Sequence, residues 1–116
     1  MNLAQKVSDN VQLVDSDMRL VLHTAAVFAC NFTNQMYSIA EDLLNQHNLD
    51  FELLRPLIEE TALKVKDESP AAVQTGPALR RDQHTINKHL QLLEQLPRYR
   101  DVYMQLTELI MKKYNS

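Results

Sequence analysis

Residues 15–46, DSDMRLVLHTAAVFACNFTNQMYSIAEDLLNQ, decide the fold of this chain, because they contain neither proline nor glycine. At their start, Asp15, Ser16 and Asp17 offer side-chain oxygens that cap the free N–H groups of a first helical turn. At about 1.5 Å per residue, one helix over this stretch is about 45 Å long, which exceeds the width of a small domain. The sequence therefore predicts a single long helix as the central element of the fold.

A second helix is predicted after a break at residues 47–50, HNLD, with Asp50 as its cap and an end near Lys66. Pro56 falls near its start, and proline cannot donate to the carbonyl four residues earlier. Two outcomes stay open: the proline kinks this helix, or it starts the helix after a preliminary turn.

Two further helices and one short one are predicted in the remainder. Ser69 and Pro70 are typical of the cap and first position of a short helix over 71–74. Asp82 caps a third long helix, and Pro97 ends it and opens a fourth. The apolar faces expected to be buried are Leu54, Leu57, Ile58, Thr61 and Val65; Ile86, Leu90 and Leu93; and Tyr99, Val102, Tyr103, Leu106, Leu109 and Ile110. The predicted fold class is all-α.

Composition excludes several classes of protein. The single glycine, Gly76, rules out a G-x-G-x-x-G turn and a P-loop within this chain. One cysteine, Cys30, forms no intrachain disulfide and favours a reduced, cytoplasmic setting. With 15 acidic against 12 basic residues, no basic field for nucleic acid is expected. The apolar run 20–32 is too short to span a membrane, no secretory signal is expected before it, and no metal-ligand spacing occurs.

Polar residues interrupt the apolar surface of the central helix. In regular α-helical geometry His23, Val27, Cys30 and Asn34 share one stripe, with Asn31 beside it. Sequence alone favours burial of the histidine and both asparagines as satisfied core groups, and an inert, packed cysteine. The alternative is that the histidine and the asparagines line a cleft and hydrogen-bond a ligand.

The segment 75–82, TGPALRRD, joins the only glycine to a proline and then to two arginines. It is either a tight connection with a charged cap, or a loop that aims Thr75 and an arginine at an anionic group. In the second case the positive end of the helix beginning near Asp82 assists. The spacing does not decide between them.

Met104 and Met111 lie off the main apolar stripe of the last helix. They are either edge packing or a second contact surface. Together with the long central helix, they lead us to expect self-association.

Four stretches carry a family resemblance: 19–34 (RLVLHTAAVFACNFTN), 56–61 (PLIEET), 75–82 (TGPALRRD) and 86–90 (INKHL). They resemble the C-terminal helical domain of a family of Rossmann-like proteins described as NADP oxidoreductases. That domain is catalogued as one of unknown function and is similar to the C-terminal domain of 6-phosphogluconate dehydrogenase. The resemblance implies an all-α bundle on one long central helix, preceded by a short non-helical N-terminal segment.

The resemblance also implies a domain organisation. A short helical segment at 3–7 and a strand-like run at 11–14 resemble the end of a preceding Rossmann-like domain. Residues 1–15 are then the remnant of that domain or a linker, and 16–116 form a helical dimerisation and substrate-side domain. The implied partners are a second copy of the chain, the N-terminal nucleotide-binding domain and a small-molecule substrate of unknown identity. NADP or NAD belongs to that other domain, and this chain binds no cofactor and is not catalytic alone.

Nine residues of this sequence match the pattern of the resembling family: His23, Asn31, Asn34, Glu60, Thr75, Gly76, Pro77, Arg80 and Asp82. The related dehydrogenases place a lysine one turn before an asparagine. If Asn31 is that asparagine, the lysine position is Val27, so His23 is left as the candidate catalytic acid or base. Asn31, Asn34, Thr75, Gly76 and Arg80 are the implied substrate-binding residues. Arg81 departs from the pattern, because glycine is common there.

A rival hypothesis needs no cofactor. In it, the chain is a free-standing helical module that binds another protein, and the same polar residues are structural. The two hypotheses differ in whether a nucleotide-binding domain accompanies this chain.

Overall fold

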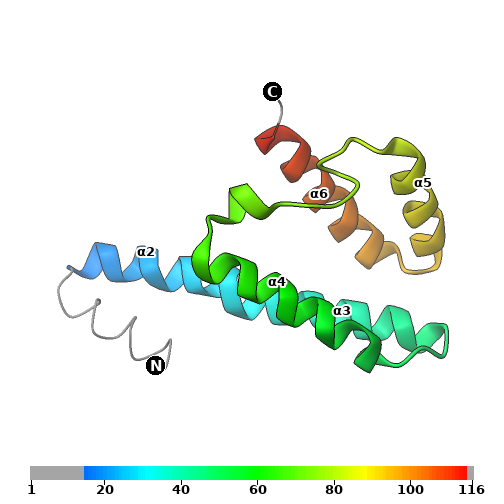
Figure 1. The fold of residues 1–116 in the computed structure, drawn as a ribbon, viewed down its shortest axis with the longest axis horizontal. Helices are drawn as coiled ribbons and strands as arrows, with labels where there is room; N and C mark the ends of the chain where they lie inside the picture. The colour runs from blue at the N-terminus through cyan, green and yellow to red at the C-terminus, as the bar shows by residue number, and fades with distance from the viewer. Residues whose placement is uncertain (1–14, 115–116) are drawn as a thin grey trace. The chain divides into compact units, whose positions relative to one another are not determined.

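A computed structural model describes residues 15–114 of the chain. The short helix and strand character predicted within residues 1–14 lie outside the described residues. Every regular element between residues 15 and 114 is helical, which confirms the all-α prediction (Figure 1). The chain divides into two compact units, Met1–Phe51 and Glu52–Ser116.

The long helix predicted over residues 15–46 is present in the first unit. It consists of α2 (Ser16–Ala26), η1 (Val27–Phe32) and α3 (Thr33–Gln46), which follow one another without a break. The carboxylate of Asp15 accepts a hydrogen bond from the Met18 N–H at 2.9 Å, so the predicted N-cap is confirmed.

The predicted break after the long helix is confirmed and has a definite geometry. Asn48 adopts a left-handed backbone, with φ 58°. Its N–H donates to the Asn45 carbonyl at 3.2 Å, and the Leu49 N–H donates to the Leu44 carbonyl at 3.0 Å. These two bonds form a Schellman ending, which satisfies carbonyls that the last turn leaves without helical partners.

The middle of the long helix differs from the expected α-helix, because η1 is π-helical. The Thr33 hydroxyl donates to the Phe28 carbonyl, five residues earlier, at 3.2 Å. The Thr33 N–H donates to the Cys30 carbonyl. A π-helical turn takes in one more residue than an α-helical turn, so the faces of α2 and α3 are offset across it.

A 3-10 turn, η2 (Phe51–Leu54), begins at the last residue of the first unit and leads into α4 (Arg55–Asp67) of the second. Pro56 stands in the first turn of α4, so it starts the helix after a preliminary turn and does not kink it. The short helix predicted at 71–74 is the 3-10 helix η3 (Pro70–Val73). The Ser69 side chain does not cap it, which contradicts the prediction; the Ser69 backbone carbonyl accepts from the Ala72 N–H at 3.0 Å instead.

The remaining elements are α5 (Gln83–Leu92), the 3-10 turn η4 (Leu93–Gln95) and α6 (Pro97–Lys113). Asp82 caps α5 and Pro97 opens α6, as predicted. Among the described residues the buried apolar side chains are Ala78, Ile86 and Leu93, all in the second unit. The buried core of the described residues is therefore small, with one side chain each from the 75–82 loop, α5 and η4.

Parts of the predicted buried faces are exposed. Leu106 and Leu109 on α6, and Leu57 and Val65 on α4, keep between 43% and 63% of their surface. The α6 helix has 17 residues and α5 has 10, so α5 is too short to cover the whole length of α6. An amphipathic pattern identifies an apolar face but does not specify what covers it.

Candidate functional site

The sequence-predicted site residues fall into two groups, one in each unit. His23, Asn31 and Asn34 lie on the long helix of the first unit, and Thr75, Gly76 and Arg80 lie in the 75–82 loop of the second.

The polar residues of the long helix are exposed. His23 in α2, Asn31 and Cys30 in η1, and Asn34 in the first turn of α3 all present their side chains to solvent. The expectation that the histidine and asparagines are buried core groups is therefore wrong for this chain, and so is the expectation of a packed cysteine. The described part of the first unit is one long helix and a turn, so it has no second helix of its own to bury them against.

The π-helical segment also changes which residues share a face. In an i→i+5 turn, the residue four positions on lies nearer to the same face than the residue three positions on. Across η1, Asn31 is therefore closer to alignment with Val27 than Cys30 is. The predicted stripe of His23, Val27, Cys30 and Asn34 assumed α-helical geometry throughout, and the π-helical geometry moves Cys30 off it.

The loop of the second unit turns at Gly76, whose φ of +106° lies in the region that side chains disfavour. A Cβ added there meets no atom within 4 Å, so backbone conformation and not space requires the glycine. The Asp82 N–H donates to the Pro77 carbonyl at 2.9 Å and the Arg80 N–H to the Gly76 carbonyl at 3.4 Å. The loop thus closes on itself and leaves Thr75 exposed at its start.

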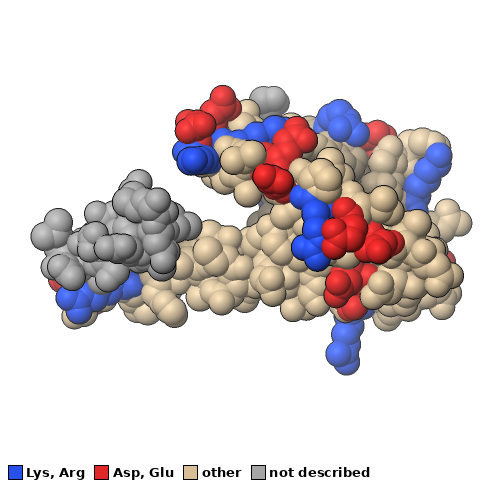
Figure 2. Space-filling view, turned by 60° about the horizontal axis from the view of Figure 1, so that its bottom comes forward, with Lys and Arg blue, Asp and Glu red and all other residues tan. Residues whose placement is uncertain are grey.

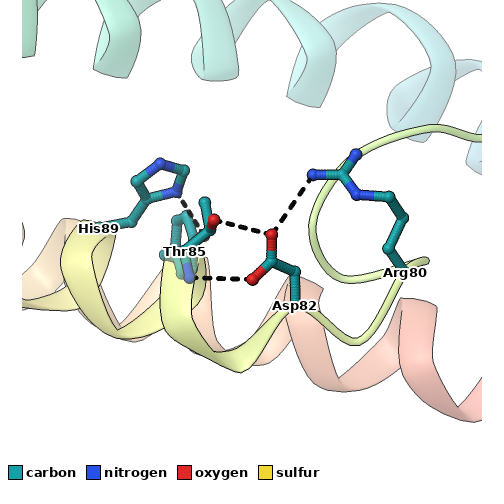
Figure 3. Close-up of polar contacts among 5 residues, drawn as sticks. Arg80, Asp82, Thr85 and His89 are labelled. Carbon is teal, nitrogen blue, oxygen red and sulfur yellow. Dashed lines mark hydrogen bonds and ion pairs between the residues drawn. The ribbon is translucent and has the colours of Figure 1, made fainter.

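The carboxylate of Asp82 accepts hydrogen bonds from the first turn of α5 (Figure 3). One oxygen accepts from the Thr85 N–H at 3.1 Å and the other from the Thr85 hydroxyl at 2.8 Å. These bonds, the side-chain one foremost, lower the pKa of Asp82, and the Arg80 guanidinium 3.7 Å away adds to the effect. The Asp82 carboxylate thus already accepts from the first turn of α5, and assistance to an anionic ligand from this helix end stays a prediction.

The two arginines of the loop have different roles. The Arg81 Nη2 atom donates to the Met111 carbonyl in the last turn of α6 at 2.9 Å, across 30 residues of sequence. The backbone of Arg81 is left-handed, with φ 55°, which is a physical reason for glycine at this position in the resembling family. The side chain of Arg80 is 61% exposed and makes only the long ion pair with Asp82 among the described residues. Arg80 is therefore the arginine of this loop whose guanidinium remains largely exposed.

A polar pair between α5 and α6 was not anticipated from the sequence. The His89 Nδ1 atom lies 2.7 Å from the Tyr103 hydroxyl, and the two rings meet edge to face at 5.7 Å. Partial burial raises the pKa of Tyr103 above its ordinary 10.0. No local signal in the sequence pairs two residues that lie 14 positions apart.

A shallow groove of about 450 Å³ runs along the same two helices, and the apolar side chains that line it are Ile86, Leu90, Tyr103, Met104 and Met111. Both methionines lie in it, and Met104 is 44% exposed. They are therefore not simply edge packing.

Two negative results concern the residues that the structure describes. Between residues 15 and 114, no cluster of three or more histidine, cysteine, aspartate or glutamate side chains is suited to hold a metal ion. No helix in that range has the length and apolar character needed to cross a membrane.

Comparisons with known proteins agree with this all-helical architecture. The family described as "Domain of unknown function (DUF2520)" matches residues 1–110. A crystal structure described as a putative NADP oxidoreductase from Bacteroides fragilis is similar at 46% sequence identity with a TM-score of 0.83. The match covers 85% of this chain and 38% of that one, so this chain spans well under half the length of its structural relative. A search of curated proteins gives no match.

Proposed function

Because the chain belongs to the family described as a domain of unknown function, DUF2520, we propose that it is the helical, substrate-side domain of an NAD(P)-dependent oxidoreductase. In this proposal it also forms the dimer contact, and it is not catalytic alone. The structural match to the Bacteroides fragilis protein carries the proposal, because 46% identity over 85% of the chain extends beyond a shared fold.

The cofactor belongs to another part of the protein in this proposal. A dinucleotide site needs a glycine-rich turn between a strand and a helix. The one glycine of this chain, Gly76, stands between η3 and α5, and no strand precedes it within the described residues. The residues present therefore do not fit NADP or NAD, and we assign the cofactor to a Rossmann-like domain outside this chain.

Substrate contact is assigned to both groups of predicted residues. His23 is proposed as the acid or base, and the amides of Asn31 and Asn34 as hydrogen-bonding groups on the long helix. Thr75 and Gly76 of the loop are proposed to approach the substrate, and the Arg80 guanidinium to meet an anionic group on it. The exposure of the His23, Asn31, Asn34 and Thr75 side chains supports this assignment, as does the Arg80 guanidinium, which is 61% exposed and makes only a long ion pair with Asp82 among the described residues.

A second copy of the chain is proposed to cover the long helix. From residue 20 to residue 40 that helix contains no Asp, Glu, Lys or Arg, and it is uncharged along the face seen in Figure 2. Leu20, Val21 and Phe28 are 62% to 66% exposed, and Phe28 stacks edge to face on Phe32 at 5.2 Å. An exposed apolar surface without charge is typical of a surface buried in an assembly. Sedimentation that shows only monomer at high concentration would contradict this part of the proposal.

The decisive experiment joins this chain to its nucleotide-binding half and measures turnover of NADPH with any substrate that the joined protein accepts. We expect His23→Ala to lower kcat by about 100-fold or more, as for loss of a general acid or base, and Asn31→Ala to raise KM. His84→Ala and Asn45→Ala are matched controls on other exposed positions and should leave both parameters unchanged. Wild-type turnover in both test variants would count heavily against the assignment.

The isolated chain provides an independent check. Calorimetry should show no tight binding of NADP to it, and tight binding would overturn our placement of the nucleotide site. Reading the genomic sequence upstream of Met1 separates this proposal from a free-standing interaction module. An in-frame strand, glycine-rich turn and helix favours the oxidoreductase, and a start codon with its own ribosome-binding site favours the module.

A further inference from the structure

Arg81 joins two segments of the second unit that are distant in sequence. Its guanidinium bonds to the Met111 carbonyl at 2.9 Å. Met111 lies among the last four residues of α6, whose carbonyls have no N–H of the same helix ahead of them. A cation at a helix C-terminus also interacts favourably with the helix dipole. The bond therefore satisfies the Met111 carbonyl and places the Arg81 cation at the favourable end of the α6 dipole.

The backbone of Arg81 shows that this position is constrained. A left-handed φ of 55° is unfavourable for a residue with a long side chain. The two neighbouring turn bonds, from the Arg81 N–H to the Ala78 carbonyl (3.1 Å) and from the Gln83 N–H to the Arg81 carbonyl (3.0 Å), hold it there. Surrounding interactions offset the local cost, and the side-chain bond to α6 is one of them.

We propose that Arg81 is a positioning residue, which fixes the 75–82 loop to the end of α6 and thereby orients Thr75 and Arg80 toward the substrate. The part concerning substrate rests on the function proposed above. The two arginines thus have different roles in the loop. Arg81 fixes the loop to α6 through the Met111 carbonyl, and the guanidinium of the adjacent Arg80 contacts the ligand. The two are neighbours in sequence, so a loop released from α6 no longer holds Arg80 in one place.

The first test measures amide hydrogen exchange of the Asp82 N–H, which closes the loop on the Pro77 carbonyl. Arg81→Gly removes the side chain and suits the left-handed backbone, so it isolates the tether. We expect exchange to quicken by about 2- to 10-fold, the effect of losing one hydrogen bond. Arg81→Lys should lie between wild type and Arg81→Gly, because it keeps a cationic donor but not the fork of the guanidinium.

Two references make the exchange result specific. The Ile86 N–H in α5 donates to the Asp82 carbonyl at 3.0 Å and should exchange as in wild type. Arg80→Ala removes the cation that pairs with the Asp82 carboxylate at 3.7 Å but leaves the tether in place, so it should accelerate Asp82 exchange less than Arg81→Gly does. Wild-type exchange in Arg81→Gly, or equal acceleration in Arg80→Ala, overturns the proposal.

The second test uses inorganic phosphate as a simple anion and follows the amide resonances of Thr75 and Arg80. We expect saturable shifts in the wild-type chain, at least threefold weaker apparent affinity in Arg81→Gly, and no saturation in Arg80→Ala. If the wild-type chain shows no saturable shift while the exchange test succeeds, the anion-binding role of the loop fails and the tether stands. Undiminished affinity in Arg81→Gly would overturn the positioning role.

Discussion

Replacing Ile86 with alanine is expected to destabilise the second unit by about 3 kcal/mol. Ile86 is 3% exposed on α5. The substitution removes three carbon groups, worth about 0.8 kcal/mol each on transfer from water, or about 2.4 kcal/mol together. The cavity adds to this, and such truncations cost about 2–5 kcal/mol. We place the result in the lower half of that range, because the few buried side chains of this unit allow the site to collapse.

The assay is urea unfolding followed by the near-ultraviolet circular dichroism of tyrosine. Tyr99, Tyr103 and Tyr114 lie in the second unit, and Tyr37 is the one tyrosine in the first, so the signal reports mainly on the second. Leu92→Ala is the matched control on the same helix, where a side chain 51% exposed predicts a loss of only about 1 kcal/mol. Equal losses in the two variants would refute the assignment of the core to this face of α5.

Three further predictions concern single side chains. The fold lowers the pKa of Asp82, so the carboxylate stabilises the folded state at pH values above its ordinary pKa of 3.8, and this contribution is lost as the pH falls through the folded-state pKa. Between pH 6 and pH 2 the urea midpoint should therefore fall less in Asp82→Asn than in wild type. Parallel curves for the two proteins would contradict this. Thr33→Val removes the hydroxyl bond that spans the π-helical segment and should shift backbone resonances throughout residues 27–32. The Thr24 hydroxyl donates to the Leu20 carbonyl, four residues earlier, at 2.8 Å, so Thr24→Val should shift only the backbone resonances of neighbouring residues. The same pattern of shifts in both variants would argue against the role of Thr33. The Arg100 Nε atom is buried without a hydrogen-bond partner among the described residues, and the Nη1 atom donates to the Met104 sulfur, a weak acceptor, at 3.2 Å. Arg100→Met should therefore leave the urea midpoint unchanged or higher, and a loss of more than about 1 kcal/mol in the free energy of unfolding would contradict this.

The helix boundaries were largely predictable, because the groups that set them are close in sequence. The Asp15 cap bonds three residues ahead, as does the Asp82 cap, and Pro56 and Pro97 act through their own rings. Ser69 failed as a cap because the 3-10 turn satisfied the N–H of Ala72 through a backbone carbonyl instead.

The candidate site was predictable only in part. The TGP turn and its left-handed glycine follow from residue type, but two adjacent arginines are equivalent in sequence. Their difference depends on Met111, which lies 30 residues away from Arg81. Similarly, the π-helical segment shifts the face of Asn31, although nothing in the run of apolar residues distinguishes it from an α-helix.

The sequence by itself determined the helical class, the long central helix, the turns and the family, because these depend on local propensity, on caps within a few residues and on recognisable motifs. The tertiary structure decided which arginine is tethered, which histidine meets a tyrosine and how much of each apolar face is covered. Such properties depend on which surfaces meet after folding. Periodicity marks a face as apolar, but burial requires a second surface, and for the long helix we propose that another copy of the chain provides it.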